Sequence, residues 1–401
     1  MTTAQTPEDV RREIRQWIAG NWDPELPIVQ WRERLADSGW ACPGWPRQWC
    51  GRSLPAALAA AAAEELKEAV VPGPASGVGM ALVAPVVLEY GSGELKRRFM
   101  RATVTGEISW CQLFSEPGAG SDLAGLQTRA TFRNEWIVTG QKVWSTGAAT
   151  ADFGLLLART DADVPKHRGI TAFVLPMRQP GVQVRPLRQM NGHRSFNEVF
   201  MDEARIPATY VIGEPGAGWT VARATLAHER RLAAFPAPPA TARGRAWREA
   251  IAERTAAAEP HKWYPQRAGR PDLVIPQARA TGRSADPVVR QEIGRLIELA
   301  WSARWMEARA AAARAAGQEA VGSLGKLASS RIAQQAARVH SMIAGASGML
   351  AGPDAPLGGI VAEILVSVPG ISIAGGTDEI QRTIIAERIL GLPREPHEGH
   401  R

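Results

Sequence analysis

The chain has 401 residues, of which 45% are hydrophobic and 22% charged, with 39 glycines and 29 prolines. This composition excludes general disorder and is sufficient for two or three folded domains. A formal charge of +7 and a pI near 9.7 favour an anionic ligand such as a nucleotide or a phosphorylated carrier. Nucleic acid is a weaker expectation, because the arginines are dispersed and no recognised reader motif is present.

No apolar segment approaches the roughly 20 residues that a membrane span needs, and the opening MTTAQTPEDVRREIRQ lacks an apolar signal segment. We therefore expect a cytoplasmic protein without a membrane span. The three cysteines, Cys42, Cys50 and Cys111, have no CxxC spacing. They are interpreted as free, mostly structural thiols, and no metal site is predicted.

Residues 1–107 are predicted to form an N-terminal helical domain. Thr6 is a capping hydroxyl before Pro7, and acidic residues follow in the first turn. Helical patterning continues through LPAALAAAAAEELKEA and ALVAPVVLEYG. Ser92 then opens a further helix at ELKRRFM.

The pattern changes near Ile108, and residues 108–216 are predicted to form an antiparallel β-barrel domain. Short β-rich runs, among them ATFRNEWIVTG, FGLLLA, GITAFVLPM and VQVRPL, are separated by Gly, Pro, Asn and Asp. The triplet Arg133-Asn134-Glu135 is predicted to turn a hairpin.

Residues 217–401 return to a helical pattern and are predicted to form a C-terminal helical bundle. Long Ala- and Arg-rich segments predict helices over about 286–316 and 322–344, and a last helix is predicted over 378–390. Proline and glycine interrupt 235–285, which is predicted to be a partly irregular insertion. The predicted fold class is therefore α+β, in the order helices, strands, helices.

A first candidate segment is WCQLFSEPGAGSDLAG, at 110–125. Backbone amides freed by Gly118 and Gly120, with the hydroxyls of Ser115 and Ser121, would suit a planar heterocycle or a phosphate. A tight Gly/Pro turn leaving a strand is the alternative interpretation.

Two further segments carry candidate chemistry. GQKVWSTGAATADFGLLLA places Trp144 beside Ser145 and Thr146, and an indole face can pack on a flat cofactor ring, although a core tryptophan is the alternative. In GGTDEIQRTIIAERILGLP, at 375–393, two glycines allow close backbone approach. Thr377 then caps a helix whose N-terminus suits an anion or a polarised ring edge, although a structural cap alone also explains it.

Together and in this order, these segments resemble the acyl-CoA dehydrogenase family of flavoproteins, from about residue 30 to 394. FSEPGAGSD is similar to the family's flavin loop and VWSTGA to its tryptophan segment. FNEVFMDEARIP with GEPGAGW is similar to its exit from the β domain, and GGTDEIQRTIIAERILGLP to its C-terminal signature. The resemblance implies a helical domain, a middle β-barrel, a helical bundle and FAD as cofactor.

The implied reaction is α,β-dehydrogenation of an acyl-CoA thioester. A carboxylate removes the α proton, the β hydrogen leaves as hydride to flavin N5, and an electron-transferring flavoprotein collects the electrons. A dimer or tetramer is also implied. The resemblance assigns FAD contacts to Phe114, Ser115, Gly120, Ser121, Trp144, Thr146, Arg279, Thr377 and Glu379, and acyl-CoA contacts to Ser121, Arg230 and Gly375.

The catalytic base is predicted to be Glu229. In many family members the carboxylate lies just before the Gly-Thr of the last motif, and this position is Gly375 here. Isovaleryl and long-chain members place the glutamate in a Leu-x-x-Glu-Arg context, which here contains Glu229 and Arg230. The positions one helical turn from Glu229 are uncharged, which suits a base. The alternative is a solvated surface glutamate paired with Arg230 or another arginine.

Two positions depart from the family pattern. The usual Arg-x-x-Phe-Gly contact to the FAD pyrophosphate is replaced by ARATGRSADP, which leaves Arg279 as the nearest candidate. A glutamine before a Gly-Gly-x-Gly turn is replaced by Met342, whose thioether cannot act as an amide. Both departures concern the half of the flavin site that is made across the dimer.

These departures leave two other functions open. One is a catalytically incomplete partner subunit of a heteromeric acyl-CoA dehydrogenase complex, and the other is a flavin oxidase on the same fold. For the enzyme itself, Gly375 and the similarity to actinobacterial members suggest a bulky, branched or ring-bearing acyl group, such as a steroid side chain.

Overall fold

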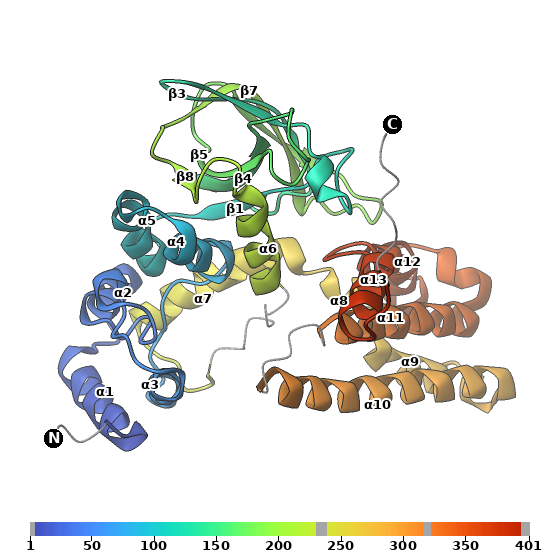
Figure 1. The fold of residues 1–401 in the computed structure, drawn as a ribbon. Coiled ribbons are helices and arrows are strands. Elements are labelled where there is room, and N and C mark those ends of the chain that lie inside the picture. The colour runs from blue at the N-terminus through green and yellow to red at the C-terminus, as the bar shows by residue number, and fades with distance from the viewer. Residues whose placement is uncertain (1–4, 230–238, 316–321, 394–401) are drawn as a thin grey trace. The chain divides into compact units, whose positions relative to one another are not determined.

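The computed structural model describes residues 5–229, 239–315 and 322–393. Within these residues no helix is long and apolar enough to cross a bilayer. The order of helices, strands and helices confirms the predicted fold class (Figure 1). The chain divides into two compact units, each described by itself: the first unit is Met1–Arg188 with Arg194–Pro260, and the second unit is Gln189–His193 with His261–Arg401.

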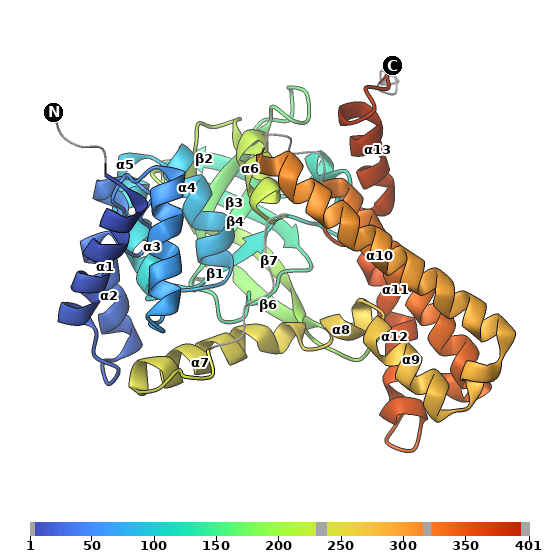
Figure 2. The ribbon, with the colours of Figure 1, turned by 90° about the horizontal axis from the view of Figure 1, so that it is seen from below.

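The first unit begins with the predicted helices, which pack around Trp31 and Leu35. The Thr6 hydroxyl accepts a hydrogen bond from the Asp9 amide at 3.2 Å and caps the first helix as predicted. Ser92 caps α5 in the same way. In Figure 2, α1, α2 and α3 lie side by side. The helices are α1 (Pro7–Asn21), α2 (Ile28–Ser38), α3 (Ala56–Glu68), α4 (Ala84–Tyr90) and α5 (Gly93–Thr105).

A curved sheet follows (Figure 1), with the strand order β6-β7-β3-β2-β4-β5-β8 and β1 beside β4. Most pairs are antiparallel, and Asn134 turns the predicted hairpin between β2 and β3 with a φ of 65°. The β1–β4 and β2–β4 pairs depart from this pattern because they are parallel. The long connections between the paired strands make that geometry possible. The strands are β1 (Trp110–Leu113), β2 (Arg129–Arg133), β3 (Glu135–Lys142), β4 (Phe153–Arg159), β5 (Ile170–Pro176), β6 (Val182–Leu187), β7 (Phe196–Ile206) and β8 (Val211–Ile212).

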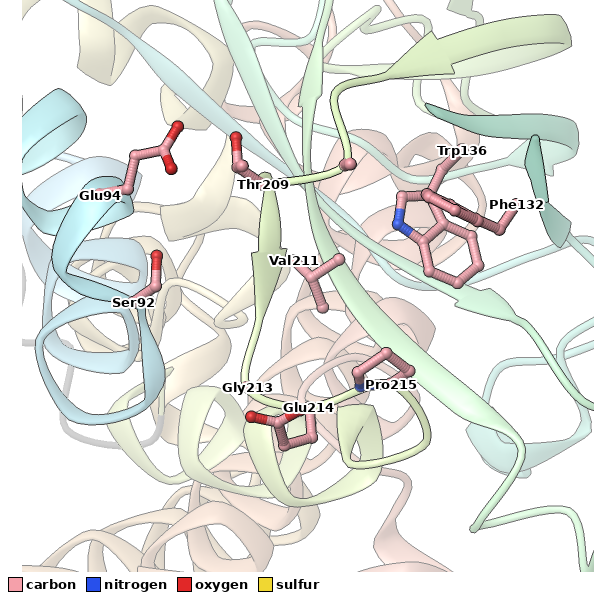
Figure 3. A pocket seen from close by; sticks show the side chains of 10 residues that line it. Ser92, Glu94, Phe132, Trp136, Thr209, Val211, Gly213, Glu214 and Pro215 are labelled. Atoms are coloured by element: carbon pink, nitrogen blue, oxygen red, sulfur yellow. The ribbon is translucent and has the colours of Figure 1, made fainter. Parts of the chain in front are cut away.

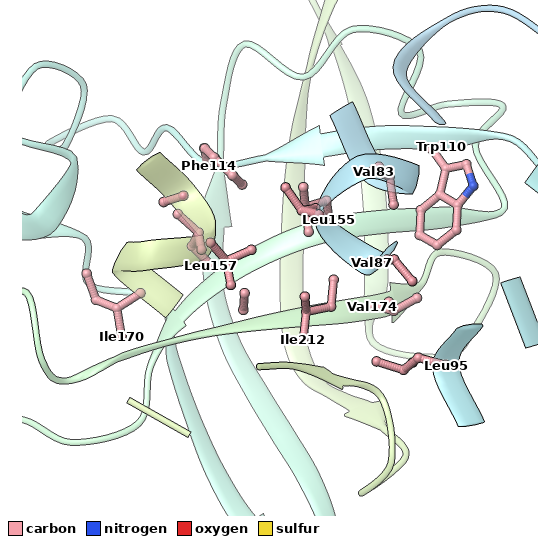
Figure 4. Packing of buried hydrophobic residues seen from close by; sticks show 14 of the residues in the cluster. Val83, Val87, Leu95, Trp110, Phe114, Leu155, Leu157, Ile170, Val174 and Ile212 are labelled. Atoms are coloured by element: carbon pink, nitrogen blue, oxygen red, sulfur yellow. The ribbon is translucent and has the colours of Figure 1, made fainter. Parts of the chain in front are cut away.

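Strands β4 and β5 are covered on both faces, which explains their uninterrupted apolar runs. Leu155 and Leu157 of β4 belong to a core shared with the helices, whereas the intervening Leu156 packs with Phe173 in a second core. Figure 4 shows Val83, together with other helix residues, converging on these strands. The alternation along β4 thereby joins the helices to the sheet.

The chain leaves the sheet through α6 (Gly218–Glu229), which packs against β5. Gly218 permits this approach, because a Cβ at that position would lie 2.6 Å from the backbone of Thr171. Beyond residue 238, the segment predicted to be partly irregular is more helical than expected. Pro265 and Pro271 stand in first turns, where the missing amide donor is tolerated. The helices here are α7 (Arg245–Ala258), α8 (Tyr264–Arg267) and α9 (Pro271–Ala280).

The second unit is a helical bundle around α11. Its core includes Val274 of α9, Val289 of α10 and Val339 of α11. The helices predicted over 286–316, 322–344 and 378–390 are confirmed. The end near 316 and the start near 322 adjoin residues 316–321, which lie outside the described residues, and the other ends agree to within two residues. They are α10 (Pro287–Ala315), α11 (Gly322–Ala344) and α13 (Asp378–Arg388), and α12 (Ile360–Ser367) lies between the last two in sequence.

The three cysteines are free thiols, as predicted. Burial raises the pKa of Cys111 to about 12 and that of Cys50 to about 11. Thiols with such pKa values are almost entirely protonated at neutral pH and therefore react poorly.

A buried polar network fastens α13 to α11. The Asp378 carboxylate is 6% exposed and accepts hydrogen bonds from Lys326 Nζ at 2.9 Å and from Ser330 Oγ at 2.8 Å. Burial alone would raise the pKa of Asp378, but the hydrogen bonds from Lys326 and Ser330 hold it below its usual value. The ionised carboxylate therefore stabilises the folded bundle.

Asp378→Asn should lower the free energy of unfolding at neutral pH by about 1–3 kcal/mol, because Lys326 loses its counter-charge. The pKa of Asp378 is lowered in the folded state, so its stabilisation is complete above the unfolded value of 3.8 and is lost as the pH falls through the folded value. The urea-unfolding free energies of wild type and variant should thus begin to converge only as the pH falls below 3.8, and should meet below the folded pKa. Exposed Asp354→Asn is the control, and a difference that does not change with pH would contradict the prediction.

Candidate functional site

Two of the three candidate segments lie side by side in the first unit. The Val143 amide, just after β3, donates a hydrogen bond to the Ser115 carbonyl, just after β1, at 2.9 Å. The loop that follows β1 is therefore joined through the backbone to the segment that carries Trp144. The structure brings together Ser115 and Trp144, which were predicted from separate motifs.

The loop after β1 is a tight turn with an open side. The main chains of Glu116 and Ala119 bond to each other in both directions, at 3.0 and 3.1 Å. A Cβ added at Gly118 or Gly120 would meet no atom within 4 Å, and Ser121 is exposed. Backbone amides and a hydroxyl are thus available beside open space.

Trp144 presents an exposed indole from an unusual backbone conformation. Its side chain is 54% exposed, its φ is 63°, and its ring meets Phe196 edge-on at 5.6 Å. A left-handed conformation costs a non-glycine residue about 1–3 kcal/mol, and such strain is often found at ligand sites. An indole held outward in this way suits stacking on a flat ring.

The residue after Trp144 is fixed by β7. Ser145 and Asn197 exchange two backbone hydrogen bonds of 3.1 Å, and the Asn197 side-chain amide also donates to the Ser145 carbonyl at 2.9 Å. Ser145 is 1% exposed, and its hydroxyl has no hydrogen-bond partner within the described part of the chain. An exposed indole, open glycines and an unsatisfied buried hydroxyl fit a heterocycle with polar edges, as in FAD.

Phe114 and Thr146 complete the predicted contacts in the first unit. Thr146 is half-buried. The Phe114 ring is 5% exposed and packs in the core shared with the helices, while its carbonyl accepts a hydrogen bond from Lys142. Contact of either residue with a cofactor stays a prediction.

Glu229 is the last residue of α6 that the structure describes, and it is half-buried. Its Oε2 lies 3.5 Å from Nε2 of Gln112, which belongs to β1. Because β1 continues into the loop at Ser115, the predicted base and the predicted flavin loop are attached to the same strand. Arg230, the predicted acyl-CoA contact, lies outside the described residues.

Gln112 was missed by sequence reasoning. Within Trp110–Leu113 the burial pattern is buried, buried, half-buried, buried, and Gln112 is the half-buried position. A polar residue in an otherwise apolar strand was the available signal, but its partner lies 117 residues further along the chain.

The third candidate segment belongs to the second unit. Gly375 has a φ of 68°, a Cβ there would meet no atom within 4 Å, and its carbonyl accepts a hydrogen bond from Gln381 at 3.1 Å. Thr377 caps α13 as predicted, with its hydroxyl accepting from the Ile380 amide. Glu379 is exposed and pairs with Arg382.

The two positions that depart from the family pattern also lie in the second unit. Arg279 is exposed near the end of α9. The Met342 carbonyl accepts a hydrogen bond from Arg283 at 3.4 Å. The Met342 side chain is not an amide, and the segment after Arg279 lacks the aromatic residue of the family's Arg-x-x-Phe-Gly motif.

A pocket of about 570 Å³ lies in another part of the first unit, between the start of α5, the β2–β3 hairpin and β8 (Figure 3). The predicted site residues do not line it, so it is not the predicted flavin site. Its lining residues are Ser92, Glu94, Phe132, Trp136, Ala208, Thr209, Val211, Gly213, Glu214 and Pro215.

The sequence matches three family descriptions in chain order. They are the N-terminal domain of acyl-CoA dehydrogenase over residues 4–107, the middle domain over 111–204 and the C-terminal domain over 275–390.

Curated relatives carry the same family name. Acyl-CoA dehydrogenase FadE34 of Mycobacterium tuberculosis is 38% identical over 92% of this chain; the chain spans about half of that relative, 47% of its length. Acyl-CoA dehydrogenase IpdE1 of the same organism is 33% identical and is matched end to end, over 98% of this chain and 99% of its own.

Solved structures share the fold. The structure named "Tcur3481-Tcur3483 steroid ACAD" is 25% identical, with a TM-score of 0.65 over 98% of this chain and 100% of its own. The ChsE4-ChsE5 complex from Mycobacterium tuberculosis is also 25% identical, with a TM-score of 0.64 over 98% of this chain and 100% of its own. With all three family domains in order and a relative matched along its whole length, the chain belongs to the acyl-CoA dehydrogenase family of flavoproteins.

Proposed function

We propose that this protein catalyses the FAD-dependent α,β-dehydrogenation of an acyl-CoA thioester, with Glu229 as the base that removes the α proton. The hydrogen bond between Gln112 and Glu229 carries the proposal. It links a carboxylate on α6 to the strand that leads into the loop at Ser115. The proposed proton acceptor and the proposed flavin loop are therefore both connected to strand β1.

Gln112 orients the base. A hydrogen bond from its neutral amide to Oε2 restricts rotation of the Glu229 carboxylate. Glu229 takes the α proton of the acyl group, and FAD, when bound, supplies the acceptor for the β hydrogen as hydride.

The residues proposed to hold FAD in the first unit are the exposed Trp144 and the open side of the loop after β1. Trp144 packs on the ring, and Ser115, Gly120, Ser121 and Thr146 supply backbone and hydroxyl groups. Phe114 contributes through its main chain, because its ring is buried. The contacts proposed in the second unit are Arg279, Thr377 and Glu379.

The acyl group is proposed to be bulky, of the steroid-side-chain type. The open space at Gly375 and the likeness to a structure named a steroid ACAD support this substrate class. Arg230 and Ser121 are the proposed CoA contacts, and an electron-transferring flavoprotein is the proposed electron acceptor. Bleaching of the flavin under anaerobic conditions by steroid-like, branched, long and short acyl-CoAs would rank the substrates.

A second candidate function is that of a partner subunit in a two-component enzyme. Met342 in place of an amide, and the likeness to a structure named as a ChsE4-ChsE5 complex, favour this alternative. Turnover by the isolated chain would exclude it. Turnover only after mixing with a second family member would support it.

The oxidase alternative requires oxygen as the electron acceptor. If the turnover rate with a dye as acceptor is the same without oxygen as with it, the reaction does not need oxygen, and this result would exclude the oxidase alternative.

Glu229→Gln should reduce the rate of flavin reduction by about 10²- to 10⁴-fold, because the amide keeps the size of the side chain but cannot accept the proton. FAD and acyl-CoA binding should stay close to wild type. Stopped-flow absorbance with a demonstrated substrate measures the rate, and exposed Glu203→Gln on β7 is the matched control. If Glu229→Gln reduces its flavin at the wild-type rate, Glu229 is not the base.

Trp144→Ala should weaken FAD retention more than Met342→Ala does. Trp144 offers an exposed ring for stacking, which is worth about 0.5–1.5 kcal/mol beyond its buried area, whereas the Met342 thioether offers no amide hydrogen bond. The flavin-to-protein absorbance ratio after gel filtration compares the two variants. If both variants lose the same fraction of their FAD, retention of the flavin ring does not depend on Trp144.

A further inference from the structure

Lys142, at the end of β3, is enclosed by protein. Its side chain is 0% exposed, and its Nζ donates to the Phe114 carbonyl at 3.0 Å and to Glu116 Oε1 at 2.8 Å. Both partners belong to the loop after β1. The ammonium group therefore reaches from one strand of the sheet into the start of the proposed flavin loop.

Glu116 connects the same ammonium to the far end of the loop. Its Oε2 accepts a hydrogen bond from the Gln127 amide at 2.6 Å, and its Oε1 accepts one from the Thr128 amide at 2.9 Å. Glu116 is itself 7% exposed. One buried ion pair thus ties the two ends of the 114–128 loop to each other and to β3.

Stability alone does not account for this pair. Burial lowers the pKa of Lys142 to about 8, against the opposing effect of Glu116. An enclosed ion pair is often no more stable than apolar side chains of the same volume, since both charges lose their hydration. Its polar contacts do, however, set the position of the loop backbone, which apolar side chains would not do.

The part of the loop between the two fastened ends is the part that faces open space. A Cβ atom added at Gly118 or Gly120 would have no neighbouring atom within 4 Å, and Ser121 is exposed. Arg159 adds a second support near the loop's end, donating to the carbonyls of Ala124 and Leu126. The open segment therefore lies between two ends of the loop that are held in place by hydrogen bonds.

We propose that Lys142 and Glu116 are positioning residues that hold the loop of residues 114–122 in the conformation that receives FAD. This inference rests on the proposed function. Lys142 acts through the Phe114 carbonyl and Glu116, because its enclosed side chain is shielded from any ligand on the open face. Pre-ordering the loop lowers the conformational entropy that FAD binding must overcome.

Lys142→Met tests the proposal, because it keeps an unbranched side chain and removes the charge. In the FAD-free protein, amide exchange at residues 115–121 should become at least about tenfold faster. The FAD dissociation constant, measured by flavin fluorescence, should rise at least about tenfold. Leu156→Ala in the core of β4 is the matched control: it should lower the melting temperature without these two effects.

The double variant Lys142→Met with Glu116→Gln separates positioning from charge balance. Removing both charges should restore much of any lost thermal stability, but FAD affinity should stay low because the contact to the Phe114 carbonyl is still missing. Recovery of both stability and FAD affinity would overturn the proposal. Equal FAD affinities for Lys142→Met and Leu156→Ala, or wild-type affinity for Lys142→Met, would also overturn it.

If Lys142→Met does not fold, Glu116→Gln takes its place in the same measurements, since it keeps an oxygen acceptor and removes the charge.

Failure of the proposed function can be told apart from failure of the positioning role. If wild-type protein takes up no FAD even after reconstitution, the proposed function fails. The exchange measurement then decides by itself whether the ion pair holds the loop.

Discussion

The candidate site depends on one junction in the sheet, where the end of β3 meets the loop that leaves β1. The Val143 amide bonds to the Ser115 carbonyl, and the Lys142 side chain crosses beneath the same loop. Once this junction forms, Trp144 follows at the surface and Ser145 is locked by Asn197. Two segments that look unrelated in the sequence therefore become neighbouring parts of one surface because a few buried polar groups must find partners.

The position of the proposed base follows from packing. Helix α6 lies close to β5 because Gly218 carries no Cβ against Thr171, and Val221 on the helix joins the core shared by helices and sheet. This placement brings Glu229 of α6 to Gln112 of β1. The packed helix holds this half-buried carboxylate in place at the edge of the core.

The second unit combines features that fit the family with features that depart from it. Thr377 caps α13, and Asp378 ties that helix to α11. Gly375 has a positive φ, so a side chain there would strain the backbone even though the space is open. Placing a carboxylate at Gly375, as other members do, would thus carry a conformational cost that a base at Glu229 avoids. Met342 in place of a glutamine, and the absence of the Phe of the Arg-x-x-Phe-Gly motif after Arg279, are the features that make a partner subunit a serious alternative.

The sequence by itself determined the features that depend on neighbours within a few residues. Thr6 and Thr377 were predicted as helix caps and Ser92 as the start of a helix, and each hydroxyl accepts a hydrogen bond from an amide three residues ahead. The Asn134 hairpin and the long helices α10 and α11 were likewise predicted, since turn chemistry and helical periodicity are local. The order of the motifs also identified the family.

Tertiary structure decided the contacts that join distant segments. The parallel pairing of β1 with β4, the hydrogen bond from Gln112 to Glu229 and the ion pair of Lys142 with Glu116 were not predicted. Periodicity shows which face of an element is buried but not which element covers it. Gln112 and Glu229 are 117 residues apart, and they meet because the packing of α6 on the sheet leaves a half-buried amide of β1 beside the Glu229 side chain.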